Sequence, residues 1–196
     1  YSGNGSTQSI TNNANAGNFK PDWLWIKERT STSQHFLFDS TRGVGKYLHA
    51  DSNSSEGNDV HNTSFDSNGF GVGQQNGTNE NSQTYVAWQW KANGGTTTSG
   101  GSDETVSTCA HQANTTAGFS VVTYSGTGTQ GHTVAHGLGV APEVIFLKAR
   151  NKSQNWRVFH HKTASDGTKR LILDQTNAQE DAAFLNDTAP SSTVFT

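Results

Sequence analysis

Two histidines in the stretch GHTVAHGLGVAPEVIFLKAR, residues 131–150, are the first candidates for chemistry in this chain. His132 and His136 are four residues apart, and on a strand this spacing places them roughly 13 Å apart on one face. One metal ion cannot bridge that distance. Gly137 and Gly139 follow His136 and favour a tight turn into the apolar run. We therefore predict a structural turn at His136, Gly137 and Gly139, with no metal bound there.

Other polar groups also lack a catalytic spacing. No G-x-S-x-G elbow is present. The acidic pairs Asp103-Glu104 and Glu180-Asp181 lie in loop-like stretches, without the framing that a glycosidase carboxylate pair needs. The segment DSNSSEGND (51–59) lacks the spacing of an EF-hand loop. We predict no catalytic residues, no metal site and no cofactor.

A tryptophan beside a polar loop is the candidate for ligand binding. A carbohydrate site uses an exposed aromatic ring surrounded by polar loop residues. Trp156 in NKSQNWRVF meets this description, with neighbouring loops at 51–59, 74–83 or 151–156. The other tryptophans lie within apolar stretches and are assigned to cores or subunit interfaces. Trp156 is therefore the predicted glycan contact.

Composition limits the classes of partner. The chain has 196 residues, is 31% hydrophobic and 10% aromatic, and carries a formal net charge of −3. Without a block of like charges, we expect no nucleic-acid partner, and without an apolar run of about 18 residues, no membrane insertion. The single cysteine, Cys109, is expected on an exposed loop with no role. The chain starts at Tyr1 rather than at Met, and we expect a segment of a longer polypeptide.

An internal repeat organises the sequence. FKPDWLWIKER (19–29) matches VAPEVIFLKAR (140–150), and YSGNGS (1–6) matches YSGTGT (124–129). KYLHADSN (46–53) matches KRLILDQT (169–176), and the offset stays between 121 and 125 residues through NGFGVG and TVFT. Four blocks in the same order predict two copies of one fold.

The repeat sets the predicted domains. Copy 1 spans residues 1–92 and lacks its start, and copy 2 spans 118–196 and lacks its end. Residues 93–117 are rich in Gly, Ser and Thr and are predicted to be a linker.

Short apolar runs and period-two alternation predict an all-β chain. The expected strands are, in the first copy, 22–28, 34–39, 46–50, 69–73 and 84–91, and in the second, 119–124, 132–136, 143–149, 156–161, 169–174 and 192–196. About seven short antiparallel strands per copy, separated by turns, favour tandem β-sandwich modules of the jelly-roll or lectin-like type.

The same residues resemble a known pattern. T-V-x-H-G-L-G-x-x-P-x-V-I-x-L-K is similar to the T-H-N-L-G-x-x-P-x-V pattern of bacteriophage tail-fibre and other virion appendage proteins. More broadly, both copies resemble a repeated β-rich domain of large structural proteins in marine phages. The first copy lacks the H-G-L-G turn. The resemblance implies a β-sandwich module along a fibre or on a particle, and it supplies no catalytic residues.

The resulting expectation is a non-enzymatic virion structural protein, a tail-fibre or surface-appendage segment involved in host attachment. Its expected location is the surface of the virion, and its expected partners are identical subunits in a homotrimer, other virion proteins and host surface glycans. The trimer follows from the analogy with fibres. The alternatives are a lectin-like carbohydrate-binding module and, third, a polysaccharide depolymerase.

Overall fold

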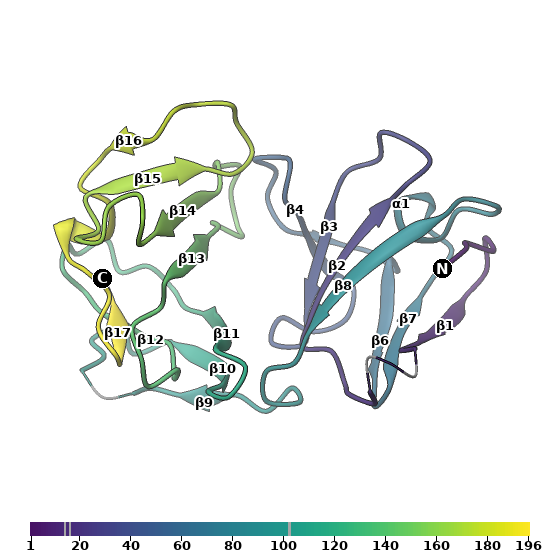
Figure 1. Cartoon of the computed structure of the whole chain (residues 1–196), viewed down its shortest axis with the longest axis horizontal. Coiled ribbons are helices and arrows are strands. Elements are labelled where there is room, and N and C mark those ends of the chain that lie inside the picture. The colour runs from purple at the N-terminus through teal and green to yellow at the C-terminus, as the bar shows by residue number, and fades with distance from the viewer. Residues whose placement is uncertain (14, 16, 102) are drawn as a thin grey trace.

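The chain folds into two β-rich halves that lie side by side, as the computed structural model shows (Figure 1). The structure describes residues 1–13, 15, 17–101 and 103–196. Every paired strand in these ranges is antiparallel, and the strands form several small sheets. The all-β prediction is confirmed.

The first half contains two sheets. The larger has the order β5 (Gly57–Asn58), β4 (Lys46–His49), β3 (Phe36–Asp39), β2 (Trp23–Glu28) and β8 (Tyr85–Trp90). The smaller has the order β1 (Gln8–Thr11), β7 (Gly69–Val72) and β6 (Asn62–Asp66). A short helix, α1 (Asn76–Asn79), precedes β8.

Apolar side chains from both sheets meet in the first core. Along β2 the burial alternates, so Leu24 and Ile26 point into this core while Trp23 and Trp25 face the other way. They pack with residues of β3, β7 and β8, namely Phe36, Phe38, Phe70, Val72 and Tyr85. The two sheets are therefore held face to face by side chains of alternate residues.

The second half is made of smaller sheets around a second core. Its sheets have the orders β11 (Phe119–Thr123), β10 (Ala110–Asn114), β9 (Thr98–Ser99); β13 (Val144–Leu147), β14 (Arg157–His160), β15 (Lys169–Ile172), β16 (Glu180–Asp181); and β12 (Val134–Ala135), β17 (Val194–Phe195). A 3-10 turn, Phe184–Asp187, completes it. The core contains Val106, Cys109, Val134, Ala135, Phe159, Phe184, Leu185 and Phe195.

The structure corrects the prediction that residues 93–117 form a linker. This segment holds β9 and β10, and β10 pairs along its length with β11. Cys109, expected on an exposed loop, is buried, and its thiol donates a hydrogen bond to the Ala135 carbonyl. Polar composition concealed these strands, because the residues of this segment that enter the core, Val106 and Cys109, are isolated and lie between them. The second half therefore begins near β9, before residue 118.

Most of the strands predicted from apolar runs are present, with ends shifted by a few residues, and the longer strands among those missed share a composition. β1, β6 and β10 have the sequences QSIT, NTSFD and AHQAN. Each is mostly polar, because pairing with a neighbouring strand satisfies the backbone without a run of apolar side chains.

The two halves share several strand pairs. β1–β7 in the first half corresponds to β12–β17 in the second, and the ladder β2–β3–β4–β5 corresponds to β13–β14–β15–β16. Ring contacts agree as well. Tyr1 meets Phe70 with centroids 6.0 Å apart at 73°, and Tyr124 meets Phe195 at 6.1 Å and 72°.

Histidines in the first half make stability depend on pH. The His61 ring packs against Phe36 and Tyr47 with centroids 4.3 and 4.9 Å away, and burial lowers its pKa from 6.5 to about 4. The native state therefore holds the neutral ring, and unfolding takes up a proton between about pH 4 and 6.5. The contribution of His61 is complete above pH 6.5 and is lost as the pH falls towards 4.

We expect His61→Asn to have a smaller loss of unfolding free energy than the wild type between pH 7.5 and 4.5. Denaturant unfolding at several pH values measures this loss. His132→Asn is the control, because its ring bonds Thr127 on the surface. Equal pH slopes for wild type and His61→Asn would contradict the assignment.

Candidate functional site

The junction between the halves is an apolar contact centred on Trp156. Its side chain is 3% exposed and packs with Leu37, Leu48 and Ala50, beside Trp23 and Trp25 on the outer face of β2. The indole Nε1 donates a hydrogen bond to the His49 carbonyl at 2.7 Å. Trp156 thus joins residues more than one hundred positions apart in the sequence.

This placement corrects the prediction for Trp156. Stacking on a sugar requires an exposed ring face, and the structure instead buries the ring between the two halves. The polar loop before it misled the interpretation, because the backbone of this loop is itself bound to the first half. Gln154 N–H donates to the Asn53 carbonyl at 2.8 Å.

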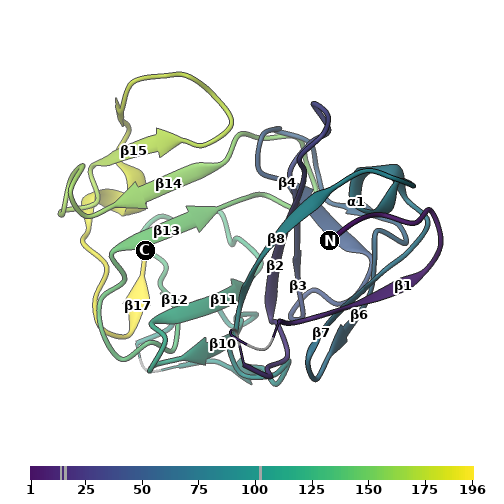
Figure 2. The same ribbon diagram turned by 45° about the vertical axis from the view of Figure 1, so that its right-hand side comes forward.

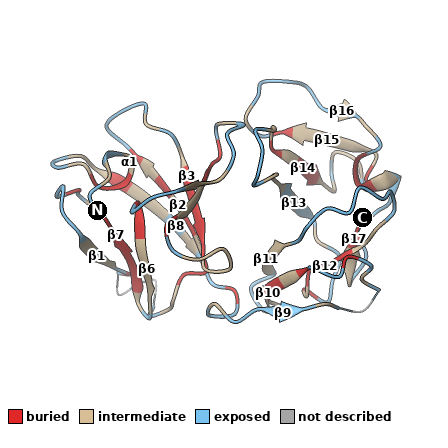
Figure 3. Ribbon diagram, turned by 180° about the vertical axis from the view of Figure 1, so that it is seen from behind, coloured by how far each residue is buried: buried red, intermediate tan, exposed pale blue. Residues whose placement is uncertain are grey.

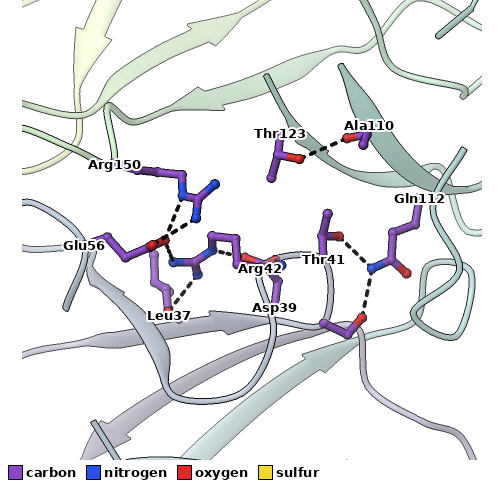
Figure 4. Close-up of polar contacts among 10 residues, drawn as sticks. Leu37, Asp39, Thr41, Arg42, Glu56, Ala110, Gln112, Thr123 and Arg150 are labelled. Atoms are coloured by element: carbon purple, nitrogen blue, oxygen red, sulfur yellow. Dashed lines mark hydrogen bonds and ion pairs between the residues drawn. The ribbon is translucent and has the colours of Figure 1, made fainter. Parts of the chain in front are cut away.

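An ion network borders the apolar contact (Figure 4). The Arg42 guanidinium binds Asp39, Glu56 and the Leu37 carbonyl, and its side chain is 3% exposed. Arg150 of the second half donates to both oxygens of the Glu56 carboxylate, at 2.8 and 2.9 Å. The planar fork of arginine suits this bidentate geometry.

Glu56 is the link between the halves in this network. Burial favours a raised pKa for its carboxyl, but hydrogen bonds and charges from Arg150 and Arg42 outweigh burial and lower the pKa. Its backbone N–H also donates to the Arg150 carbonyl at 2.8 Å. The 51–59 loop, weighed above as a calcium or glycan site, is thus part of the junction.

Gln112 makes a second polar connection at the far side. Its side-chain Nε2 donates to Ser40 Oγ at 2.9 Å and to Thr41 Oγ1 at 2.6 Å, and Figure 4 shows it reaching across to Thr41. Asp22 fixes the start of the connecting segment, because its carboxylate accepts from the N–H groups of Ala92 and Gly94. The halves are therefore tied at both ends of their contact.

A cleft of about 840 Å³ lies between the halves, and the junction residues Leu37, Leu48 and Trp156 form part of its lining. Its walls come from β11 and β13 of the second half and from Trp23, Trp25 and Trp90 of the first. Figure 2 shows β11 and β13 on the side of the second half that approaches β2 and β8. Much of the lining is apolar and solvent-exposed, including Val144 and Phe146 on β13. The residues of β13 alternate between exposed and intermediate burial (Figure 3).

The two histidines considered first have separate environments. His132 Nδ1 lies 2.9 Å from Thr127 Oγ1 in a surface loop. His136 is buried, its Nδ1 accepts from Leu138 N–H at 3.2 Å, and burial lowers its pKa. Among the residues that the structure describes, no three His, Cys, Asp or Glu side chains are grouped to hold a metal ion.

The glycines after His136 have left-handed backbone angles, as a turn there would require. Gly137 and Gly139 adopt φ angles of 71° and 75°. A Cβ on Gly137 would lie 2.5 Å from the His111 ring, so only glycine fits there. Elsewhere, His160 ends β14 and His161 begins a turn, and their rings stack 5.2 Å apart.

Sequence reasoning missed the main site residues, Arg42, Glu56, Arg150 and the exposed β13 side chains. The ion network joins residues from separate halves, and no sequence spacing reports such a contact. The sequence did contain one indication of the exposed face of β13. The internal repeat aligns Phe146 with Trp25, a residue assigned to a core or an interface. In the ranges described, no helix is long and apolar enough to cross a membrane.

We expect Trp156→Ala to lower the free energy of unfolding by about 3–5 kcal/mol, because it leaves a cavity at the junction and removes the bond to His49. Denaturant unfolding measures the change. The control is Val60→Ala, whose side chain is 51% exposed and should cost about 1 kcal/mol or less. A loss for Trp156→Ala no larger than that of the control would contradict the role of Trp156 in the junction.

Comparison with known proteins gives a family without an activity. No curated protein and no solved structure matches the chain. Residues 1–196 match a family described as a domain of unknown function, DUF7483. The match covers the whole chain, and the chain belongs to this family.

Proposed function

We propose that the chain is a non-enzymatic structural module of a bacteriophage virion appendage that takes part in host attachment. In this proposal each half is one copy of a β-sandwich repeat, and successive copies dock against one another on the surface of the particle. Homotrimers and other virion proteins are the proposed partners. The resemblance of the HGLG stretch and the flanking strand to tail-fibre patterns supports the virion location.

The observation that carries the proposal is the way the two halves dock. An extended appendage must keep its shape along its length, so neighbouring repeats need a fixed relative orientation. Trp156 buried on the face of β2 and the pairing of Glu56 with Arg150 give this contact both an apolar and an ionic part. Stacked repeats that contact only their neighbours make extended arrays.

Immunogold labelling tests the location. Antibodies raised against residues 1–196 are applied to purified particles of the phage that encodes the chain, with pre-immune serum as control. We expect gold on an appendage of intact particles. A chain present in the infected-cell lysate but undetectable in purified particles, by labelling and by mass spectrometry, would overturn the proposal.

A second candidate function, glycan binding, is favoured by two exposed indoles. Trp88 and Trp90 are 44% and 39% exposed on the same face of β8, at positions i and i+2. Residues with this spacing are about 7 Å apart along a strand. Trp90 also stacks on Phe119, with centroids 6.0 Å apart, at the margin of the cleft. Adjacent aromatic faces of this kind suit stacking on sugar rings.

A glycan array with the wild-type chain tests this candidate. We expect Trp88→Ala to lose at least tenfold in affinity for any glycan that the wild type binds, because it removes one stacking face. Val60→Ala, another exposed apolar side chain, is the control. Glycan binding that is unchanged in Trp88→Ala and in Trp90→Ala would exclude this site.

A further inference from the structure

β13 has an open edge where its counterpart in the first half has a neighbour. β2 pairs with β3 on one side and with β8 on the other. β13 pairs with β14, and in the described ranges no strand pairs with its second edge. The His161 N–H donates to the Glu143 carbonyl, so the backbone groups of Val144, Phe146 and Lys148 point to the open edge.

The first half shows what occupies this position. There β8 lies between β2 and the segment Tyr1–Gly3. Tyr85 N–H donates to the Tyr1 carbonyl at 2.9 Å, and Gly3 N–H donates to the Gln83 carbonyl at 2.8 Å. On the other side, Arg29 N–H donates to the Thr84 carbonyl at 2.7 Å. Both edges of β8 are therefore engaged at this end.

In the second half, the counterparts of the two segments that flank β8 border the cleft. The motif Tyr-Ser-Gly recurs at 124–126, directly after β11, and Tyr124 lines the cleft together with β13. The position that β8 fills in the first half therefore corresponds to the space between β11 and β13 in the second. Both strands present an unpaired edge.

In the second half, the side chains around this space lack the contacts that β8 supplies in the first half. Tyr1 stacks on Tyr85 with centroids 5.1 Å apart, and its counterpart Tyr124 is 40% exposed. Trp25 meets Trp88 edge to face at 5.7 Å, and its counterpart Phe146 is 52% exposed. An open apolar strand edge favours pairing with another strand.

We propose that the cleft is an acceptor for an extended segment with the sequence pattern of β8, supplied by another repeat of this family. The segment adds antiparallel to the open edge of β13 and contacts β11 with its other edge. Its alternate aromatic residues cover Phe146 on one face and stack on Tyr124 on the other. This inference rests on the repeat that the proposed function assumes. Main-chain pairing provides affinity, and alternate side chains provide specificity.

The test uses the chain of 196 residues and a labelled peptide of residues 83–92, QTYVAWQWKA. Fluorescence anisotropy measures binding, and hydrogen exchange locates it. We expect saturable binding at one peptide per chain, with slowed exchange of the Val144, Phe146 and Lys148 amides. Absence of binding, or slowed exchange only outside β11 and β13, would overturn the proposal.

A matched peptide isolates the backbone pairing. Arg29 N–H bonds the Thr84 carbonyl, so alternate residues Val86 and Trp88 direct their N–H groups to β2. In the docked peptide the same two groups meet β13. N-methylation of both keeps the side chains and removes these donors. We expect at least tenfold weaker binding, and equal binding of the methylated peptide would contradict strand addition.

Variants of the acceptor complete the test. We expect Phe146→Glu to weaken peptide binding at least tenfold without changing the unfolding midpoint, because the ring is exposed. Val60→Glu is the control, since Val60 is 51% exposed and outside the cleft. A dimer of the unmixed chain that Phe146→Glu dissociates, and that the peptide does not displace, would place a different surface in the cleft and would overturn the proposal. Immunogold labelling of particles is independent of this result, so the two proposals can fail separately.

Discussion

The coverage of β2 on both faces is the constraint on which the rest of the structure depends. Leu24 and Ile26 enter the first core on one face, while Trp23 and Trp25 meet the junction around Trp156 on the other. A strand with apolar side chains on both faces is stable only when both are kept from water. The second half covers the outer face of β2. The stability of the first half therefore depends on the docking of the second.

The ion network fixes the relative orientation of the two halves. A buried guanidinium costs several kcal/mol unless its donors are satisfied. Arg42 has Asp39, Glu56 and the Leu37 carbonyl as partners, and Glu56 is in turn held by Arg150. Apolar contact alone tolerates sliding, whereas this set of bonds forms in one relative orientation. The same residues therefore limit how the two halves lie against each other.

The two halves differ at the strand next to β2 and β13. In the first half β8 completes the sheet and buries Tyr85 in the core. In the second half the edge of β13 is open, and its flanks carry the charged residues Glu143 and Lys148. Charges at the ends of an open strand limit unspecific association. The cleft thus borders a strand position that is filled in the first half and unpaired in the second.

The sequence alone determined the all-β class, most of the apolar strands and the glycines with left-handed backbone angles after His136. These features depend on alternation and on backbone angles, which neighbouring residues set. It also contained the internal repeat, whose counterparts Tyr124 and Phe195 reproduce the contact of Tyr1 with Phe70. Polar strands such as β10 were missed because their pairing is satisfied by backbone groups that every residue carries.

Only the tertiary structure decided the roles of Trp156, Glu56 and Phe146. An aromatic residue that follows a polar loop has the same local sequence whether its ring is exposed to solvent or buried against the other half. The difference arises from residues about one hundred positions away, His49 for Trp156 and Arg150 for Glu56. The exposure of Phe146 likewise depends on a neighbouring strand and not on β13 itself. Burial at a junction is a property of two surfaces together, and one stretch of sequence describes only one of them.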